Sequence, residues 1–158
     1  MGSMALPLRF SPKIIEVDRS LFTAQIWYMK TGRYARGKQY TIAVGREGYE
    51  TPRGVYFVQK KEYNPSWLPP DADWVGPDLR DPVTGKPVRI PGGDPRNPLA
   101  GCFIWLGGGD GVGFHGVPAE EDFSVGTAAS HGCLRMHVAD VLDLAGRVAL
   151  GTPVIIYG

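Results

Sequence analysis

The sequence predicts a mainly β fold with one short helix, and three observations lead to this class. Glycine (22 residues) and proline (14 residues) are abundant, and such residues favour turns over long helices. The stretches between these turn residues are rich in β-branched and aromatic side chains, as strands are. A single stretch near the end carries the apolar spacing of an amphipathic helix.

The predicted strands occupy most of the chain outside one long loop. Two of them are separated only by the polar residues DRS, and a third alternates apolar with polar or small side chains. The later ones are short apolar runs bounded by glycine or proline. In chain order the predicted strands are 13–17, 21–29, 37–45, 54–59, 102–106 and 154–157.

The predicted helix covers residues 137–148 (HVADVLDLAGRV). Asp140 falls in its first turn and Arg147 in its last, as the helix dipole favours. Four apolar residues at the spacing i, i+3, i+4 and i+7 predict one buried stripe: Val138, Val141, Leu142 and Ala145.

Residues 62–101 lack clear periodicity, which is unusual for so long a segment inside a domain. The segment contains apolar residues that disordered segments usually lack. We therefore predict an ordered, proline-braced loop, with a short hairpin at 83–88, that acts as a lid over a binding site. A passive insert is the alternative. The apolar anchors are Trp67, Leu68, Trp74, Val88 and Ile90.

The length of 158 residues fits one domain, predicted at 13–158. Residues 1–12 are interpreted as a tag remnant and lead-in, since Met1-Gly2-Ser3 precedes a second methionine. A net charge of +1 argues against nucleic acid as a partner. The absence of any run of 18 apolar residues predicts no membrane span in this sequence.

One of the two cysteines, Cys133, lies in the segment SHGCLRM, and a second His-Gly pair precedes it in GFHGV (113–117). The glycine and small residues around it leave backbone amides open to a ligand. A helix starting near 137 would lower the pKa of its thiol. A nucleophile with a histidine base is therefore the favoured interpretation, and inert packing is one alternative. A zinc site is another, built from His115, His131, Cys133 and His137.

These segments together resemble the signature of the L,D-transpeptidase catalytic domain, the YkuD-type family of bacterial cell-wall enzymes. That signature is His-Gly, a spacer, Ser/Thr-His-Gly-Cys, an apolar residue, and Asn or Arg. Here fourteen residues, Gly116 to Ala129, separate His115 from SHGCLR (130–135). Further family motifs extend the resemblance over 13–157: TPRGVYFV (51–58), NPSWLPP (64–70), PRNPLAG (95–101) and GTPVIIY (151–157). NPLA stands where the family usually has Asn-Pro-Leu-Gly, and residues 71–94 have no clear counterpart.

The resemblance implies a YkuD-like β-sandwich with Cys133 as nucleophile and His115 as general base. Gly116 would orient the imidazole of His115 through its backbone carbonyl. The oxyanion hole would comprise backbone amides of Gly132 and Cys133, with His131 nearby.

Four further residues receive roles at this stage. Arg135 would bind a substrate carboxylate or, equally, form a structural salt bridge. Ser130 is a candidate substrate contact or, alternatively, a turn hydroxyl. We expect His137 to belong to the helix cap and Cys102 to pack in the core, although a disulfide between Cys102 and Cys133 stays open.

The family's activity would be attack on peptidoglycan stem tetrapeptides, with a thioester intermediate and a 3→3 cross-link as product. Water as acceptor would give an L,D-carboxypeptidase, and a protein lysine would tether a lipoprotein. A non-catalytic wall-binding or zinc-stabilised domain is the alternative from a different class. The resemblance further implies no cofactor, acylation by carbapenems, and a location outside the cytoplasmic membrane. It leaves the oligomeric state open.

Overall fold

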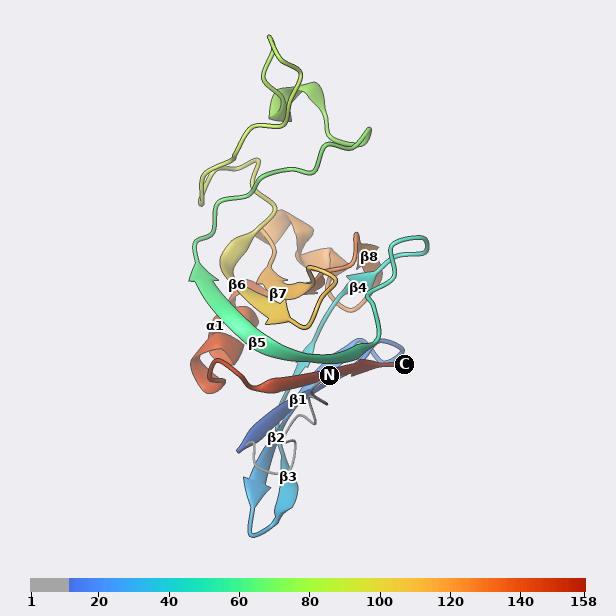
Figure 1. Ribbon diagram of the computed structural model, residues 1–158, viewed down its shortest axis with the longest axis vertical. Coiled ribbons are helices and arrows are strands. Elements are labelled where there is room, and N and C mark those ends of the chain that lie inside the picture. The colour runs from blue at the N-terminus through green and yellow to red at the C-terminus, as the bar shows by residue number, and fades with distance from the viewer. Residues whose placement is uncertain (1–11) are drawn as a thin grey trace, which may run out of the picture.

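The computed structural model describes residues 12–158, and these form a mainly β structure with one α-helix (Figure 1). The predicted tag remnant and lead-in, residues 1–12, lies outside the described residues except for Pro12. The strands are β1 (Lys13–Asp18), β2 (Thr23–Lys30), β3 (Arg33–Thr41), β4 (Val44–Gly45), β5 (Gly54–Tyr63), β6 (Ala100–Gly107), β7 (Gly113–Gly116), β8 (Ala128–Ser130), β9 (Leu134–Met136) and β10 (Pro153–Tyr157). The helices are η1 (Pro77–Leu79) and η2 (Ala119–Ser124), both 3₁₀, and α1 (Val138–Arg147).

Eight strands form one sheet in the order β3-β2-β1-β10-β5-β6-β7-β9. Two of its pairs are parallel, β1 with β10 and β7 with β9, and the others are antiparallel. Strands β4 and β8 make a small parallel pair of their own. Each strand predicted from the sequence has a counterpart, and the missed ones are β7, β8 and β9.

The large sheet curls until its two ends meet. Just beyond β3, Ala43 exchanges two backbone hydrogen bonds with Arg135 of β9: the Ala43 amide donates to the Arg135 carbonyl (2.8 Å) and the Arg135 amide to the Ala43 carbonyl (3.0 Å). The curled sheet therefore faces itself across an apolar core, as the layers of a sandwich do. The predicted β-sandwich is confirmed. Large side chains of this core are Phe114, Ile15, Ile26, Ile42, Ile104, Leu134, Met136 and Leu144.

Helix α1 packs against β6 and β7 and so supports the strands that carry the site. Its buried residues are Val141, Leu144 and Ala145, so Leu144 takes the place of the predicted Leu142, which is 40% exposed, and Val138 is only partly buried. Asp140 in the first turn and Arg147 in the last are confirmed. Gly101 in β6 allows the close packing, since a Cβ there would lie 2.9 Å from the Val138 side chain. No helix among residues 12–158 is long and apolar enough to cross a membrane.

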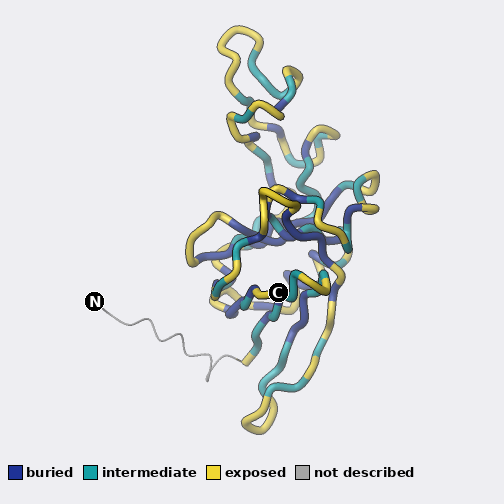
Figure 2. Tube along the Cα trace, turned by 90° about the vertical axis from the view of Figure 1, so that its right-hand side faces the viewer, coloured by how far each residue is buried: buried dark blue, intermediate teal, exposed yellow. Residues whose placement is uncertain are grey.

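The segment between β5 and β6 is an ordered loop that extends from one end of the molecule, opposite the β2–β3 hairpin (Figure 1). Its two arms are joined by hydrogen bonds between Trp67 and Ile90, and the buried Asn97 amide donates to the carbonyls of Pro65 and Pro91. Around the predicted hairpin the chain turns back with a single bridge, between Arg80 and Pro87. Buried stretches of this loop alternate with exposed tips (Figure 2).

Candidate active site

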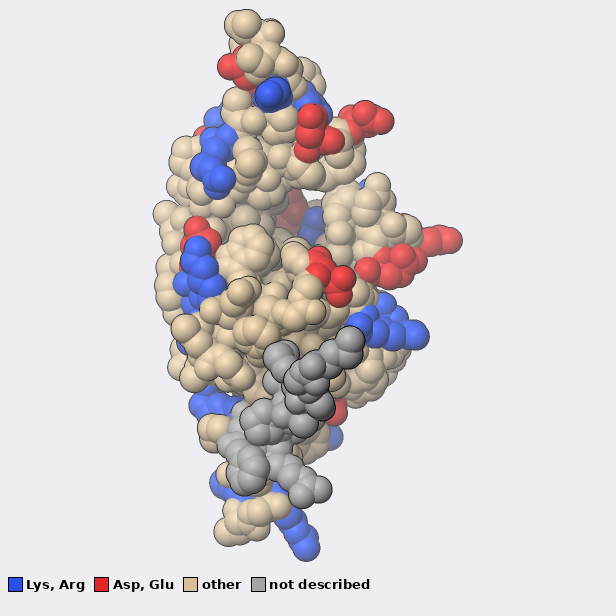
Figure 3. All heavy atoms as spheres, in the orientation of Figure 1, with Lys and Arg blue, Asp and Glu red and all other residues tan. Residues whose placement is uncertain are grey.

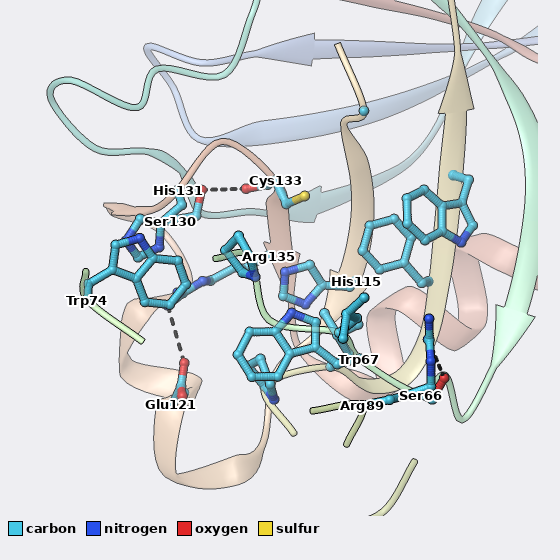
Figure 4. A pocket seen from close by; sticks show the side chains of 17 residues that line it. Ser66, Trp67, Trp74, Arg89, His115, Glu121, Ser130, His131, Cys133 and Arg135 are labelled. Carbon is cyan, nitrogen blue, oxygen red and sulfur yellow. Dashed lines mark hydrogen bonds and ion pairs between the residues drawn. The ribbon is translucent and has the colours of Figure 1, made fainter. Parts of the chain in front are cut away.

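A cavity of about 630 Å³ lies between the long loop and the strands β6, β7 and β9 (Figure 4). One wall carries Cys133, His115 and Arg135, and the loop contributes aromatic and proline side chains opposite. Lysine, arginine and acidic residues are interspersed over the face in Figure 3, without one dominant sign. The lining residues are Ser66, Trp67, Leu68, Pro70, Trp74, Arg89, Pro98, Leu99, Phe103, Trp105, Gly111, His115, Glu121, Ser130, His131, Cys133 and Arg135.

Parallel pairing of β7 with β9 brings the predicted nucleophile and base together. In this register His115 lies beside Arg135, and Cys133 directly precedes β9. Residues two apart in a strand share a face, so His115, Arg135 and Cys133 all face the cavity. Glycines let β7 lie close to β6. A Cβ at Gly113 would lie 2.3 Å from the Phe103 ring, and a Cβ at Gly116 would lie 2.3 Å from the Ala100 carbonyl oxygen.

The imidazole of His115 is fixed by the residue that follows it. Its Nδ1 lies 2.9 Å from the Gly116 carbonyl oxygen. That oxygen can only accept, so Nδ1 carries the proton and Nε2 keeps its lone pair. Burial lowers the pKa of His115 to about 4, although the Gly116 hydrogen bond opposes the shift. At neutral pH the ring is therefore an uncharged base with one free nitrogen.

The thiol of Cys133 is also uncharged at rest. Burial raises its pKa, while a hydrogen bond with the Gly113 backbone and the charge of Arg135 act in the opposite direction. The expectation that a helix end would lower this pKa was wrong, because desolvation outweighs the favourable contacts. The thiol and imidazole thus form a neutral pair, in which attack must be coupled to proton transfer.

Hydrogen bonds inside the segment SHGC hold the backbone around the cysteine. The buried Ser130 hydroxyl donates to the Cys133 carbonyl (2.6 Å) and accepts from the Gly132 amide (3.0 Å). Ser130 thus makes the turn hydrogen bonds of its alternative interpretation and also lines the cavity, and the Gly132 amide is already bonded within the loop. The Cys133 amide has no acceptor among residues 12–158, which makes it the candidate oxyanion donor.

The family model for YkuD, the L,D-transpeptidase catalytic domain, matches residues 12–156. The chain belongs to this family. The putative L,D-transpeptidase YqjB of Bacillus subtilis is 34% identical over 121 residues, which cover 74% of this chain and 57% of that protein. The chain thus spans little more than half the length of this relative.

Solved L,D-transpeptidase structures share the fold. The catalytic domain from Enterococcus faecium L,D-transpeptidase has 26% sequence identity and a TM-score of 0.55, with 92% of this chain and 96% of that one covered. The structure of the Ldtfm-avibactam carbamoyl enzyme has 26% identity and a TM-score of 0.62, with 94% and 49% covered.

In this member of the family, the ring of His131 connects the segment SHGC to neighbouring loops, and we call this role a structural joint. It stacks on Trp74 of the long loop (4.5 Å between centroids) and meets Tyr49 edge-on (4.9 Å). Its Nε2 accepts a hydrogen bond from the Arg46 guanidinium (3.0 Å). Burial and the charge of Arg46 lower its pKa. The ring is therefore committed to neighbouring loops, and its predicted part in the oxyanion hole has no support in these contacts.

Arg135 realises the salt-bridge alternative and still lines the cavity. Its guanidinium lies 3.3 Å from the Glu121 carboxylate and donates to the Ser124 hydroxyl (3.4 Å). Its side chain is 18% exposed, which leaves part of the guanidinium facing the cavity. A substrate carboxylate would have to share this cation with Glu121.

His137 and the second cysteine, Cys102, do not line the cavity. His137 pairs with Asp122 (2.8 Å) at the start of α1 and gives no side-chain cap. Among residues 12–158, no three metal-binding side chains gather, so the zinc alternative finds no assembled ligand set. Cys102 is buried in the core as predicted, and both cysteines are free thiols.

Several cavity residues were not singled out from the sequence. Arg89 and Ser66 lie on the far side of His115 from Arg135 and are hydrogen-bonded to each other (3.0 Å; Figure 4). The ring of Phe103 stacks on His115 with centroids 5.6 Å apart. Phe103 belonged to a predicted strand, but its partner across the sheet was not predictable without β7.

Proposed function

We propose that this domain is a cysteine-dependent L,D-transpeptidase that acts on peptidoglycan stem tetrapeptides and forms 3→3 cross-links through a thioester acyl-enzyme. The observation that carries this proposal is the neutral pair of Cys133 and His115 in one cavity, with Nδ1 of His115 bound to the Gly116 carbonyl. Family membership supplies the substrate class. Under this proposal the donor and acceptor stem peptides are the partners, and the domain works outside the cytoplasmic membrane.

Acylation starts from the neutral pair. Nε2 of His115 takes the thiol proton as the Cys133 sulfur attacks the L-centre carbonyl carbon of the third residue of the donor stem. The Cys133 amide stabilises the oxyanion of the tetrahedral intermediate, and the Gly116 carbonyl stabilises the new imidazolium through Nδ1. Collapse breaks the peptide bond. His115 returns its proton to the leaving amino group of the terminal D-residue, and a thioester remains.

Resolution reverses these roles. An amino group of a second stem attacks the thioester carbonyl while Nε2 of His115 accepts its proton. The intermediate collapses with departure of the Cys133 sulfur, which recovers a proton from the imidazolium. Water in place of the amine gives an L,D-carboxypeptidase, and a protein lysine gives a tethered lipoprotein. Product analysis with and without an acceptor stem separates these outcomes.

The cavity suits a peptide donor that carries free carboxylates. Trp67 and Phe103 offer apolar surface in the cavity, and Phe103 stacks on His115, while Arg135 and Arg89 place cations on opposite sides of His115. Guanidinium groups bind carboxylates with paired hydrogen bonds. We propose that the two arginines hold charged groups of the stem while the scissile carbonyl lies over Cys133.

Exposure of the protein to a carbapenem, followed by intact mass measurement and peptide mapping, tests the proposal. We expect one covalent adduct on Cys133, because its carbonyl attack is assisted by His115, and none on Cys102, whose thiol is buried in the core with a raised pKa. The Cys102→Ser variant should react like the wild type, and Cys133→Ser should not react. An adduct on Cys102, or an unreactive protein holding one equivalent of zinc, would refute the nucleophile assignment.

A further inference from the structure

Thr51 lies outside the cavity, yet it contacts the backbone of the nucleophile segment. It sits in the turn between β4 and β5, and only 1% of its surface is exposed. Its hydroxyl donates to the Gly132 carbonyl (2.7 Å) and accepts from the Gly45 amide (2.9 Å). A hydroxyl with one proton thereby joins β4 to the residue before the nucleophile.

The Gly132 carbonyl and the Cys133 amide belong to the same peptide unit. In a planar trans peptide, the C=O and N–H bonds point in opposite directions. Fixing the Gly132 carbonyl on Thr51 therefore turns the Cys133 N–H away from the buried side, where Thr51 lies. Gly132, whose φ is 124°, has no Cβ, so side-chain sterics at this residue do little to hold the orientation of the peptide that follows it.

The surrounding turn reinforces the same contact. The Arg46 amide donates to the Ser130 carbonyl (3.0 Å), and Arg19 donates a hydrogen bond to the Thr51 carbonyl. Gly45 allows the turn to close tightly, because a Cβ there would lie 2.0 Å from the Tyr49 carbonyl oxygen. The Thr51 hydroxyl is thus anchored on a rigid turn that is itself bonded to the nucleophile segment.

We infer that Thr51 is a positioning residue for the oxyanion hole: its hydroxyl fixes the Gly132–Cys133 peptide so that the Cys133 amide points at the developing oxyanion. This role rests on the proposed acyl-transfer function. It assigns the family's Thr-Pro-x-Gly segment, here TPRG (51–54), a task in catalysis in addition to starting a strand.

The Thr51→Val variant keeps the shape of the side chain and removes the hydroxyl. We expect acylation of Cys133 by a carbapenem to slow by about 10- to 100-fold, since loss of an oxyanion donor itself costs about 10² to 10³. Alkylation of Cys133 by iodoacetamide forms no oxyanion and should change less than about threefold. Thr51→Ser keeps the hydroxyl and should restore most of the acylation rate. Raising the pH should not bring the acylation rate of Thr51→Val back to that of the wild type. Its ratio of acylation rate to alkylation rate should also stay low.

Equal slowing of acylation and alkylation in Thr51→Val would overturn the inference, because a general disturbance of the segment would then suffice. So would a Thr51→Ser variant as slow as Thr51→Val. If Thr51→Val does not fold, Thr51→Ala replaces it, and the same rate ratio decides. A wild-type protein that alkylates at Cys133 but never acylates would instead contradict the proposed function.

Discussion

The dipeptide His-Gly occurs twice in the candidate site, and its two copies do different things. His115 lies inside the cavity wall with Nδ1 on the Gly116 carbonyl, so its other nitrogen stays free for proton transfer. The ring of His131 is exposed, stacks on Trp74 and accepts a hydrogen bond from Arg46. The two rings therefore differ in which nitrogen is hydrogen-bonded and to what, and this difference makes His115 the candidate base and His131 a structural joint.

The two glycines differ as well. Gly116 is required by close approach, because a Cβ there would lie 2.3 Å from the Ala100 carbonyl oxygen. A Cβ at Gly132 would meet nothing nearer than 3.7 Å, and that residue is required by its φ of 124°. One glycine sets the distance between strands, and the other shapes the turn in front of Cys133. The same dipeptide, His-Gly, is therefore part of a closely packed strand in one place and of a backbone turn in the other.

The largest expected effect is the loss of acylation rate when the candidate base, His115, is removed. His115→Ala should slow acylation of Cys133 by about 100-fold or more, as loss of a general base does. Because the neutral thiol keeps a small thiolate fraction, raising the pH towards about 9 should recover part of the loss. The measurement is the acylation rate of wild type and variant against pH. His131→Ala is the matched control and should show no such alkaline recovery. If only His131→Ala recovers in alkali, the base has been assigned to the wrong histidine.

The second prediction concerns stability and the buried neutral ring of His115. Its pKa is about 4 in the folded protein, against about 6.5 for an unperturbed histidine, so between these pH values the unfolded chain binds a proton that the folded one does not. The stabilisation is complete above about pH 6.5 and is lost as the pH falls towards 4. It amounts to about 3 kcal/mol.

Urea unfolding of wild type and His115→Gln at several pH values measures this contribution. Acidic groups titrate in both proteins and cancel in the difference. The free energy of unfolding should fall more steeply in the wild type between neutral pH and about pH 4. Parallel curves would mean that His115 is not buried as a neutral ring.

The parts of this site that were predictable are those encoded by local spacing. The separation of His115 from the segment SHGC led to the base and nucleophile, and strongly patterned strands such as β2 and β10 were found directly. Strands β7, β8 and β9 were missed because they are three or four residues long, too short for a periodic pattern to be recognised. Only sheet pairing makes them strands.

What the sequence did not reveal depends on contacts between distant segments. The bridge between Ala43 and Arg135 that closes the sandwich joins residues far apart in the chain. The raised pKa of Cys133 follows from burial under the finished fold. Likewise, the Gly132 amide was an expected oxyanion donor because the local sequence does not say that the Ser130 hydroxyl already accepts from it. Such competition for one donor becomes visible only in three dimensions.

The smallest expected effect tests whether His131 acts as a joint between the nucleophile segment and the long loop. Trp74 is 44% exposed, so its stack with His131 should contribute about 0.5 to 1 kcal/mol beyond burial. We expect His131→Ala and Trp74→Ala each to slow acylation by about three- to tenfold, since a loosened loop holds the donor less well. The double variant should be little slower than either single one, because both remove the same contact. The opposite result would be a double variant whose loss of acylation rate equals the product of the two single losses, with no coupling in the free energy of unfolding. The two rings would then act separately, and His131 would have a direct part in the chemistry.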